Sequence, residues 1–134
     1  MTEYTVKPRG VVSQFKHGGF VVYEKNGHGL VAAITDLGKM DWNTAKTACD
    51  ELILNGYSDW YLPSKVELNA LYVNLKKLGV GGFAKGYWSS SVYFDFVGGL
   101  DRFSAWCQFF NDDDGYQRDG RKRDSYYVRA VRAF

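Results

Sequence analysis

The residues of this 134-residue chain that could perform chemistry are two cysteines, two histidines and a short acidic run. Cys107 would act as a nucleophile only beside a base, but His17 and His28 both lie far away in the amino-terminal part. Two cysteines, Cys49 and Cys107, are too few for a disulfide framework or a four-ligand zinc site. We therefore expect no catalytic residues, no resident metal and no cofactor.

The acidic run is Asp112-Asp113-Asp114, which precedes Gly115. A calcium site needs carboxylates and amides that converge from one loop. Three adjacent aspartates point in different directions and repel one another, so a solvated turn is the favoured interpretation and a calcium site the minor alternative.

Basic residues gather further on, at Arg118, Arg121, Lys122 and Arg123. They could attract an acidic polysaccharide, although Asp119 and Asp124 interrupt the run and neutralise part of it. The formal net charge of +2 is too small for sequence-independent binding to phosphates, so we expect no nucleic-acid partner.

Length and composition predict a single globular domain over residues 1–134, because 46% of the residues are hydrophobic and 24% are charged. No apolar run approaches the roughly 20 residues of a membrane span, so membrane insertion is not expected. The first residues lack the basic-then-apolar pattern of a secretory signal, which leaves the localisation unknown.

Residues 1–86 carry the patterns of a scaffold. Apolar runs predict strands over residues 11–15, 20–23 and 30–34, and Asn26-Gly27 predicts a hairpin turn between the last two. Helical spacing and caps predict a helix over 42–54 behind Asp41, and a second one from Lys65 behind the capping box of Ser64 and Glu67 to Gly79. The expected buried faces are Trp42, Ala45, Cys49, Leu52 and Ile53 in the first helix, and Leu68, Leu71, Tyr72, Leu75 and Leu78 in the second. Strands and helices in this order indicate an α+β domain.

Residues 87–134 show no helical pattern. Strands are expected over 87–91, 105–111 and 126–133, with a long loop over 92–104. Alternation in the middle strand puts Trp106, Gln108 and Phe110 on one side, which leaves Cys107, Phe109 and Asn111 facing solvent. The alternative is that the 92–104 loop covers Phe109. On the last strand, at least one of Arg129 and Arg132 is expected to pair with a carboxylate.

Several runs resemble the Lcl-type C-terminal domain family over residues 18–134. They are Gly19-Phe20-Val21-Val22-Tyr23, His28-Gly29-Leu30-Val31-Ala32-Ala33, Asn55-Gly56-Tyr57-Ser58-Asp59-Trp60-Tyr61-Leu62-Pro63-Ser64, Tyr87-Trp88-Ser89-Ser90 and Tyr127-Val128-Arg129-Ala130-Val131-Arg132. The resemblance implies a C-type lectin fold of the formylglycine-generating-enzyme subtype, with two helices packed on a small, mostly antiparallel sheet. The enzyme of that subtype uses a cysteine pair that this sequence does not offer.

The carboxyl-terminal part is also similar to the variable proteins of diversity-generating retroelements from gut bacteria and their phages. In that system AAC codons of a template become NNC codons, which never encode Lys, Glu, Gln, Met or Trp. Residues 92–104 contain none of these five types, and residues 116–126 contain only Gln117 and Lys122, at positions that the family keeps fixed. The resemblance implies a hypervariable region over about residues 92–126.

The favoured hypothesis is therefore a ligand-binding protein that recognises a cell-surface protein or glycan through this variable surface, displayed on a phage particle or a cell surface. The alternative is a fixed adhesin domain that binds glycans or glycosaminoglycans without diversification. Oligomers are possible, because display on a particle favours multivalency. The candidate ligand-binding residues are Tyr93, Phe94, Asp95, Phe96, Asp101, Arg102, Phe103, Cys107, Phe109, Asn111, Asp112, Tyr116, Arg118, Asp119, Arg121, Arg123, Asp124 and Tyr126.

Overall fold

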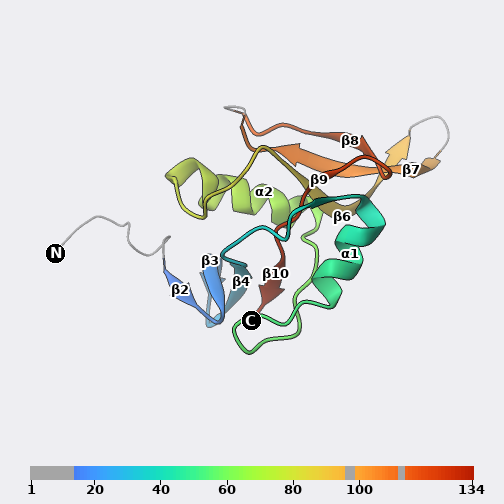
Figure 1. Cartoon of the computed structure of the whole chain (residues 1–134). Helices are drawn as coiled ribbons and strands as arrows, with labels where there is room; N and C mark the ends of the chain where they lie inside the picture. The colour runs from blue at the N-terminus through green and yellow to red at the C-terminus, as the bar shows by residue number, and fades with distance from the viewer. Residues whose placement is uncertain (1–13, 96–98, 112–113) are drawn as a thin grey trace.

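The structure is a computed structural model that describes residues 14–95, 99–111 and 114–134. It is an α+β arrangement of two α-helices and two mostly antiparallel sheets (Figure 1). Helix α2 lies between the two sheets, and α1 lies at one side of the molecule (Figure 1).

The first sheet has four strands in the order β10-β4-β3-β2, and every pair in it is antiparallel. Its strands are β2 (Phe15–Lys16), β3 (Gly19–Lys25), β4 (His28–Ala32) and β10 (Val131–Ala133). The predicted hairpin turn is confirmed, because Asn26 and Gly27 both have positive φ, at 56° and 81°. The predicted strand over 11–15 lies mostly outside the described residues.

The second sheet has five strands in the order β5-β9-β6-β7-β8. They are β5 (Lys39–Met40), β6 (Gly86–Asp95), β7 (Gly99–Phe109), β8 (Gln117–Arg121) and β9 (Tyr126–Tyr127). Only the β6–β9 pair is parallel. The prediction of a loop over 92–104 is wrong, because β6 and β7 pair as a hairpin as far as Asp95 and Gly99.

The carboxyl-terminal strand expected over 126–133 is two strands in different sheets. Tyr126 and Tyr127 belong to the five-stranded sheet, whereas β10 completes the four-stranded sheet by pairing with β4. The residues between these two strands pass next to the end of β4, where the N–H of Ala33 donates to the carbonyl of Ala130 at 2.9 Å. Residues 1–86 and 87–134 therefore share both sheets.

Helix α1 (Trp42–Asp50) begins where its cap predicts, since the Thr44 N–H donates to Asp41 Oδ1 at 2.9 Å. It ends four residues earlier than expected, and the chain leaves the helix at Glu51. The expected buried face is confirmed for Trp42, Ala45 and Cys49. It is wrong for Ile53, which is 76% exposed because it lies beyond the helix end.

Helix α2 (Lys65–Asn74) has the predicted capping box, in which Ser64 and Glu67 bond reciprocally. The chain then tightens into the 3₁₀ helix η2 (Lys76–Leu78) and stops at Gly79, whose φ is 77°. The apolar stripe expected for the second helix is buried as far as Leu75. Leu78 is 56% exposed, because three residues per turn rotate it away from the α-helical stripe.

Two core clusters lie on opposite faces of the five-stranded sheet. One joins the buried residues of α1 to Trp60, Trp88 and Cys107, and the other joins α2 to Tyr87 and Phe110. The second cluster also includes Val22, Leu30 and Ala32 of the four-stranded sheet. The central strands are thus buried on both faces, which fixes the framework beneath the carboxyl-terminal surface.

A candidate ligand-binding surface

Strand β7 does not present the outward face that its alternation predicts. Cys107 is fully buried, so its expected exposure is wrong. The reason is that Trp88 and Tyr126 cover this side of the strand and join it to the core. Burial raises the pKa of the Cys107 thiol to about 11, although Arg118 and Tyr126 offset part of the effect. Cys107 therefore belongs to the framework.

Three aromatic residues form a surface over this framework, which we call the aromatic platform: Phe109, Tyr116 and Tyr126. The rings of Phe109 and Tyr116 stack with centroids 5.6 Å apart, and Tyr126 meets Phe109 edge-on at 5.9 Å. Tyr126 also meets the buried ring of Trp88 edge-on, with centroids 4.8 Å apart, which connects the platform to the core. Tyr116 is 44% exposed and the other two are half-buried, so the platform is held by the core and still reaches solvent.

Arg118 adds a positive charge to the platform. Its guanidinium carbon lies 5.8 Å from the centroid of Phe109, and the side chain is exposed. A hydrogen bond with Tyr116 raises the pKa of the guanidinium further above its ordinary value. Arg118 is the register partner of Cys107 in the β7–β8 pair. The exposed cation and the buried thiol therefore lie on neighbouring strands at the same position along the sheet.

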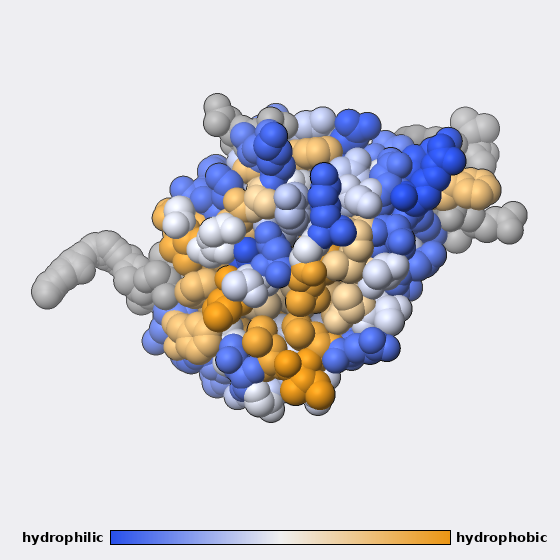
Figure 2. Space-filling model, viewed as in Figure 1, coloured by the Kyte–Doolittle hydropathy of each residue, from blue (hydrophilic) through white to orange (hydrophobic). Residues whose placement is uncertain are grey.

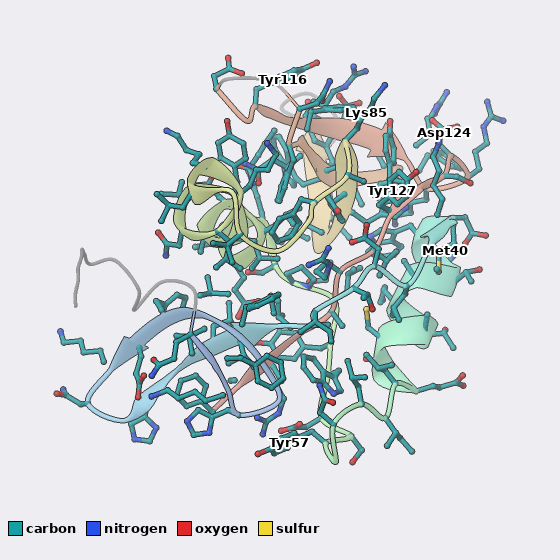
Figure 3. The ribbon with its side chains drawn as sticks, turned by 60° about the vertical axis from the view of Figure 1, so that its left-hand side comes forward. Met40, Tyr57, Lys85, Tyr116, Asp124 and Tyr127 are labelled. Carbon is teal, nitrogen blue, oxygen red and sulfur yellow. The ribbon has the colours of Figure 1, made fainter. Side chains whose placement is uncertain are left out.

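A pocket of about 380 Å³ opens beside the platform. It is lined by Lys39, Ala84, Lys85, Gly86, Phe109, Ser125, Tyr126 and Tyr127. Gly86 leaves room for the rings, since a Cβ there would lie 3.2 Å from Cε1 of Phe109 and 3.3 Å from Cδ1 of Tyr126. Figure 3 shows Lys85, Tyr127, Tyr116 and Asp124 at the same end of the molecule, away from Tyr57.

Sequence reasoning missed the part of this pocket that the scaffold provides. Lys39 comes from β5, and Lys85 from the segment before β6, whereas the predicted ligand-binding residues all lie within residues 92–126. No spacing signal connects Lys39 to Tyr127, because the pairing of β5 with β9 brings them together.

Other predicted residues belong to separate places. Tyr93 contacts Trp106 with ring centroids 5.0 Å apart, and the ammonium of Lys65 lies 3.4 Å from the Trp106 centroid. Phe103 is 69% exposed and lines a second pocket, of about 350 Å³, with Arg121 and Arg123. Phe103, Arg121 and Arg123 therefore line a different pocket from the one that Phe109 and Tyr126 line.

The cations of the basic run have different neighbours. Lys122 lies over the ring of Trp42, with 4.4 Å from Nζ to the centroid, while Arg118 lies over Phe109. Arg121 and Arg123 belong to the second pocket. Figure 2 shows hydrophilic residues over the upper end of the molecule, where the five-stranded sheet lies.

The remaining predicted residues fall into two groups. Asn111, Asp119 and Asp124 are exposed, as expected for a recognition surface. Phe96 and Asp112 lie outside the described residues, as do the side chains of Phe94, Asp95, Asp101 and Arg102.

The expected pairing of carboxyl-terminal arginines with carboxylates is confirmed for both residues. Arg129 Nε lies 2.8 Å from Asp36, and Arg132 Nε lies 2.7 Å from Asp59. Within the described ranges no three side chains of His, Cys, Asp or Glu are grouped as metal ligands. Asp113, like Asp112, lies outside those ranges, so the calcium alternative for the acidic run stays a hypothesis. None of the described helices is both long and apolar enough to span a membrane.

These features define a small α+β domain whose five-stranded sheet carries a half-exposed aromatic surface beside a pocket. The family model of the Lcl C-terminal domain matches residues 21–132, and the chain belongs to this family. No curated protein matches the chain.

Proposed function

We propose that this domain is a ligand-binding protein that recognises a partner on a cell surface through the aromatic platform and its surroundings. The observation that carries the proposal is the platform itself. Phe109, Tyr116 and Tyr126 reach solvent as a group, with Arg118 beside them, above a core that holds them in place. Aromatic and arginine side chains dominate binding hot spots because they bury a large area with few rotatable bonds.

We further propose that the surface is diversified by a retroelement and that the fold is a C-type lectin fold of the formylglycine-generating-enzyme subtype. Within residues 92–126 the charged residues of β8 and the following turn are exposed except for the partly buried Lys122, whereas Ser104, Cys107 and Gln108 are buried. A protein of this kind can change the first group at small cost in stability and must keep the second.

Gln117 and Lys122, the two residues within 116–126 that break the codon rule, have structural roles that support this proposal. Gln117 Nε2 donates to the carbonyl of Lys65 at 2.8 Å and thereby ties β8 to α2. The backbone carbonyl of Lys122 accepts from the backbone N–H of Trp42 at 3.0 Å, and the Lys122 ammonium lies over the indole ring of Trp42. Both would have to stay fixed while their neighbours vary.

Binding without catalysis is also proposed. Cys107, the candidate nucleophile of the sequence, is buried with a raised pKa, and neither property suits a nucleophile. A fixed adhesin for acidic glycans is the second candidate, but one cation of the basic run, Lys122, already lies over the ring of Trp42, which weakens it.

A screen of the full chain against glycans and cell surfaces tests the binding proposal, with Tyr116→Ala as the test variant. Tyr116 is exposed, so the variant should keep the melting temperature and weaken binding by about 30-fold, the effect of losing a hot-spot residue. Tyr23→Ala is the matched control, since Tyr23 is 47% exposed on β3 in the other sheet. Equal binding by both variants would contradict the proposal.

The DNA sequence of the gene tests diversification separately. We expect NNC codons at the exposed positions within residues 92–126, and an imperfect repeat of this segment near a reverse transcriptase gene. Codons that end mostly in A or G, with no such repeat, would leave the fixed adhesin as the better hypothesis.

A further inference from the structure

The pocket beside the aromatic platform carries an uncompensated positive charge. Two lysines, Lys39 and Lys85, line it, and none of the described lining residues is acidic. Among the described residues, neither ammonium has a carboxylate within ion-pair distance, whereas Arg129 and Arg132 are both paired. Two unpaired ammonium groups at one pocket favour an anion there, because a charged donor and a charged acceptor form the stronger hydrogen bonds.

Most of the rest of the pocket is aromatic or apolar. Phe109, Tyr126, Tyr127, Ala84 and Gly86 line it, and Ser125 adds one polar side chain. The Lys39 ammonium lies 5.7 Å from the centroid of the Tyr127 ring, so a positive charge and an aromatic ring are neighbours in this pocket. Pockets that combine aromatic walls with a few polar groups bind ligands that have both characters.

Hydrogen bonds hold the segment that carries Lys85. The Ala84 N–H donates to the hydroxyl of Tyr87 at 2.6 Å, and this hydroxyl donates in turn to Asp36. The Arg129 guanidinium pairs with the same carboxylate, and its Nη2 lies 3.4 Å from the Gly82 carbonyl. A site held in this way loses little conformational entropy when it binds.

The charge distribution favours a peptide over a polyanionic polysaccharide. A polyanion gains from a continuous row of cations, but Lys39 and Lys85 are the only cations among the described residues that line this pocket, and Lys122 lies over Trp42 instead. Two lysines at one aromatic pocket are complementary to a single carboxylate next to an apolar group. A protein segment can supply both groups from two adjacent residues, one acidic and one apolar.

We infer that the pocket formed by Lys39, Lys85, Phe109, Tyr126 and Tyr127 binds a protein partner through an acidic side chain flanked by an apolar side chain. The inference rests on the proposed function and names the partner's chemistry. In it the scaffold lysines fix the carboxylate, and the aromatic residues of the carboxyl-terminal region select the apolar neighbour.

Calorimetric titration of the full chain with an array of short capped peptides tests the inference. Each peptide contains one aspartate followed by one of the seven residues Leu, Ile, Val, Met, Phe, Tyr or Trp, and each has a matched peptide with asparagine. At least one acidic peptide should bind about tenfold more tightly than its asparagine counterpart, the change expected for one charge-assisted hydrogen bond.

The double variant Lys39→Gln/Lys85→Gln should abolish this preference. Lys25→Gln/Lys77→Gln removes the same charge at two exposed positions outside the pocket and should retain it. Melting curves of both variants check that each is folded.

Three outcomes would overturn the inference: no acidic peptide binds, the acidic and amide peptides bind equally, or a heparin oligosaccharide binds the wild type more tightly than any peptide and depends on the two lysines. If Tyr116→Ala weakens binding in the cell-surface screen while the acid preference is missing, the inference is wrong and the proposed function stands. If Tyr116→Ala has no effect on any binding, the proposed function itself is wrong.

Discussion

At the scale of single residues, Cys107 shows how neighbours decide what a side chain can do. Its alternation within β7 predicts a thiol in solvent, yet the rings across the sheet remove it from water. Cys49, on the buried face of α1, is in the same condition, and burial raises its pKa to about 12. Neither cysteine is in a disulfide.

Both thiols should therefore be unreactive in the folded protein. At pH 8 a thiol with a pKa of about 11 has about a hundredth of the thiolate of an ordinary cysteine, so its reaction with a disulfide reagent should be at least about 100-fold slower. Absorbance of the released chromophore measures this, and both thiols should react at once in concentrated guanidinium. Rapid reaction of either thiol in the native state would contradict the prediction.

At the scale of elements, the edge strand β8 is the part of the sheet that joins framework and surface. Its exposed residues are Arg118, Asp119 and Arg121. The strand has none of the apolar side chains whose alternation predicts a strand, which is why the sequence did not predict it. The buried residue of β8 is Gly120, whose position faces the rings of Trp88 and Tyr126.

Gly120→Ala should destabilise the protein by about 1–3 kcal/mol, the usual range for overpacking a filled core. A Cβ at this position would lie 2.9 Å from Cε2 of Tyr126 and 3.1 Å from Cζ3 of Trp88, and Trp88 is fully buried and has no room to move. Urea unfolding gives the free energy. Asp119→Ala, on the same strand but exposed, serves as the control and should change it by no more than about 0.5 kcal/mol.

At the scale of the whole molecule, two arginines near the carboxyl terminus tie distant segments together. Arg129 is 1% exposed and bonds to Asp36, to the Ala33 carbonyl and to the Gly82 carbonyl. Arg132 bonds to Asp59 and to the His17 carbonyl. The first carboxylate is 19% exposed and the second 60%, so the two pairs differ chiefly in their access to water.

Removing the two carboxylate charges should therefore have unequal effects. Asp36→Asn leaves a buried guanidinium without its counter-charge and should cost about 3–5 kcal/mol. Asp59→Asn changes a solvent-screened pair and should cost no more than about 1 kcal/mol. Thermal and urea unfolding of both variants measure the difference, and equal losses would mean that burial does not govern these pairs.

The sequence by itself determined the local elements of this protein. The Asp41 cap, the capping box at Ser64, the Asn26-Gly27 turn and the stop at Gly79 lie where they were predicted, because each depends on a few neighbouring residues. The runs that resemble the Lcl-type family likewise indicated the family to which the chain belongs.

Only the tertiary structure decided which side chains of the carboxyl-terminal region reach water and which residues meet at the pocket. Phe109 is half-buried, and the rings of Tyr116 and Tyr126, which come from later segments, lie against it. Lys39 and Tyr127 are 88 positions apart in the sequence and meet because β5 pairs with β9. Burial and pocket shape depend on contacts between distant segments, and neither composition nor periodicity encodes which segments those are.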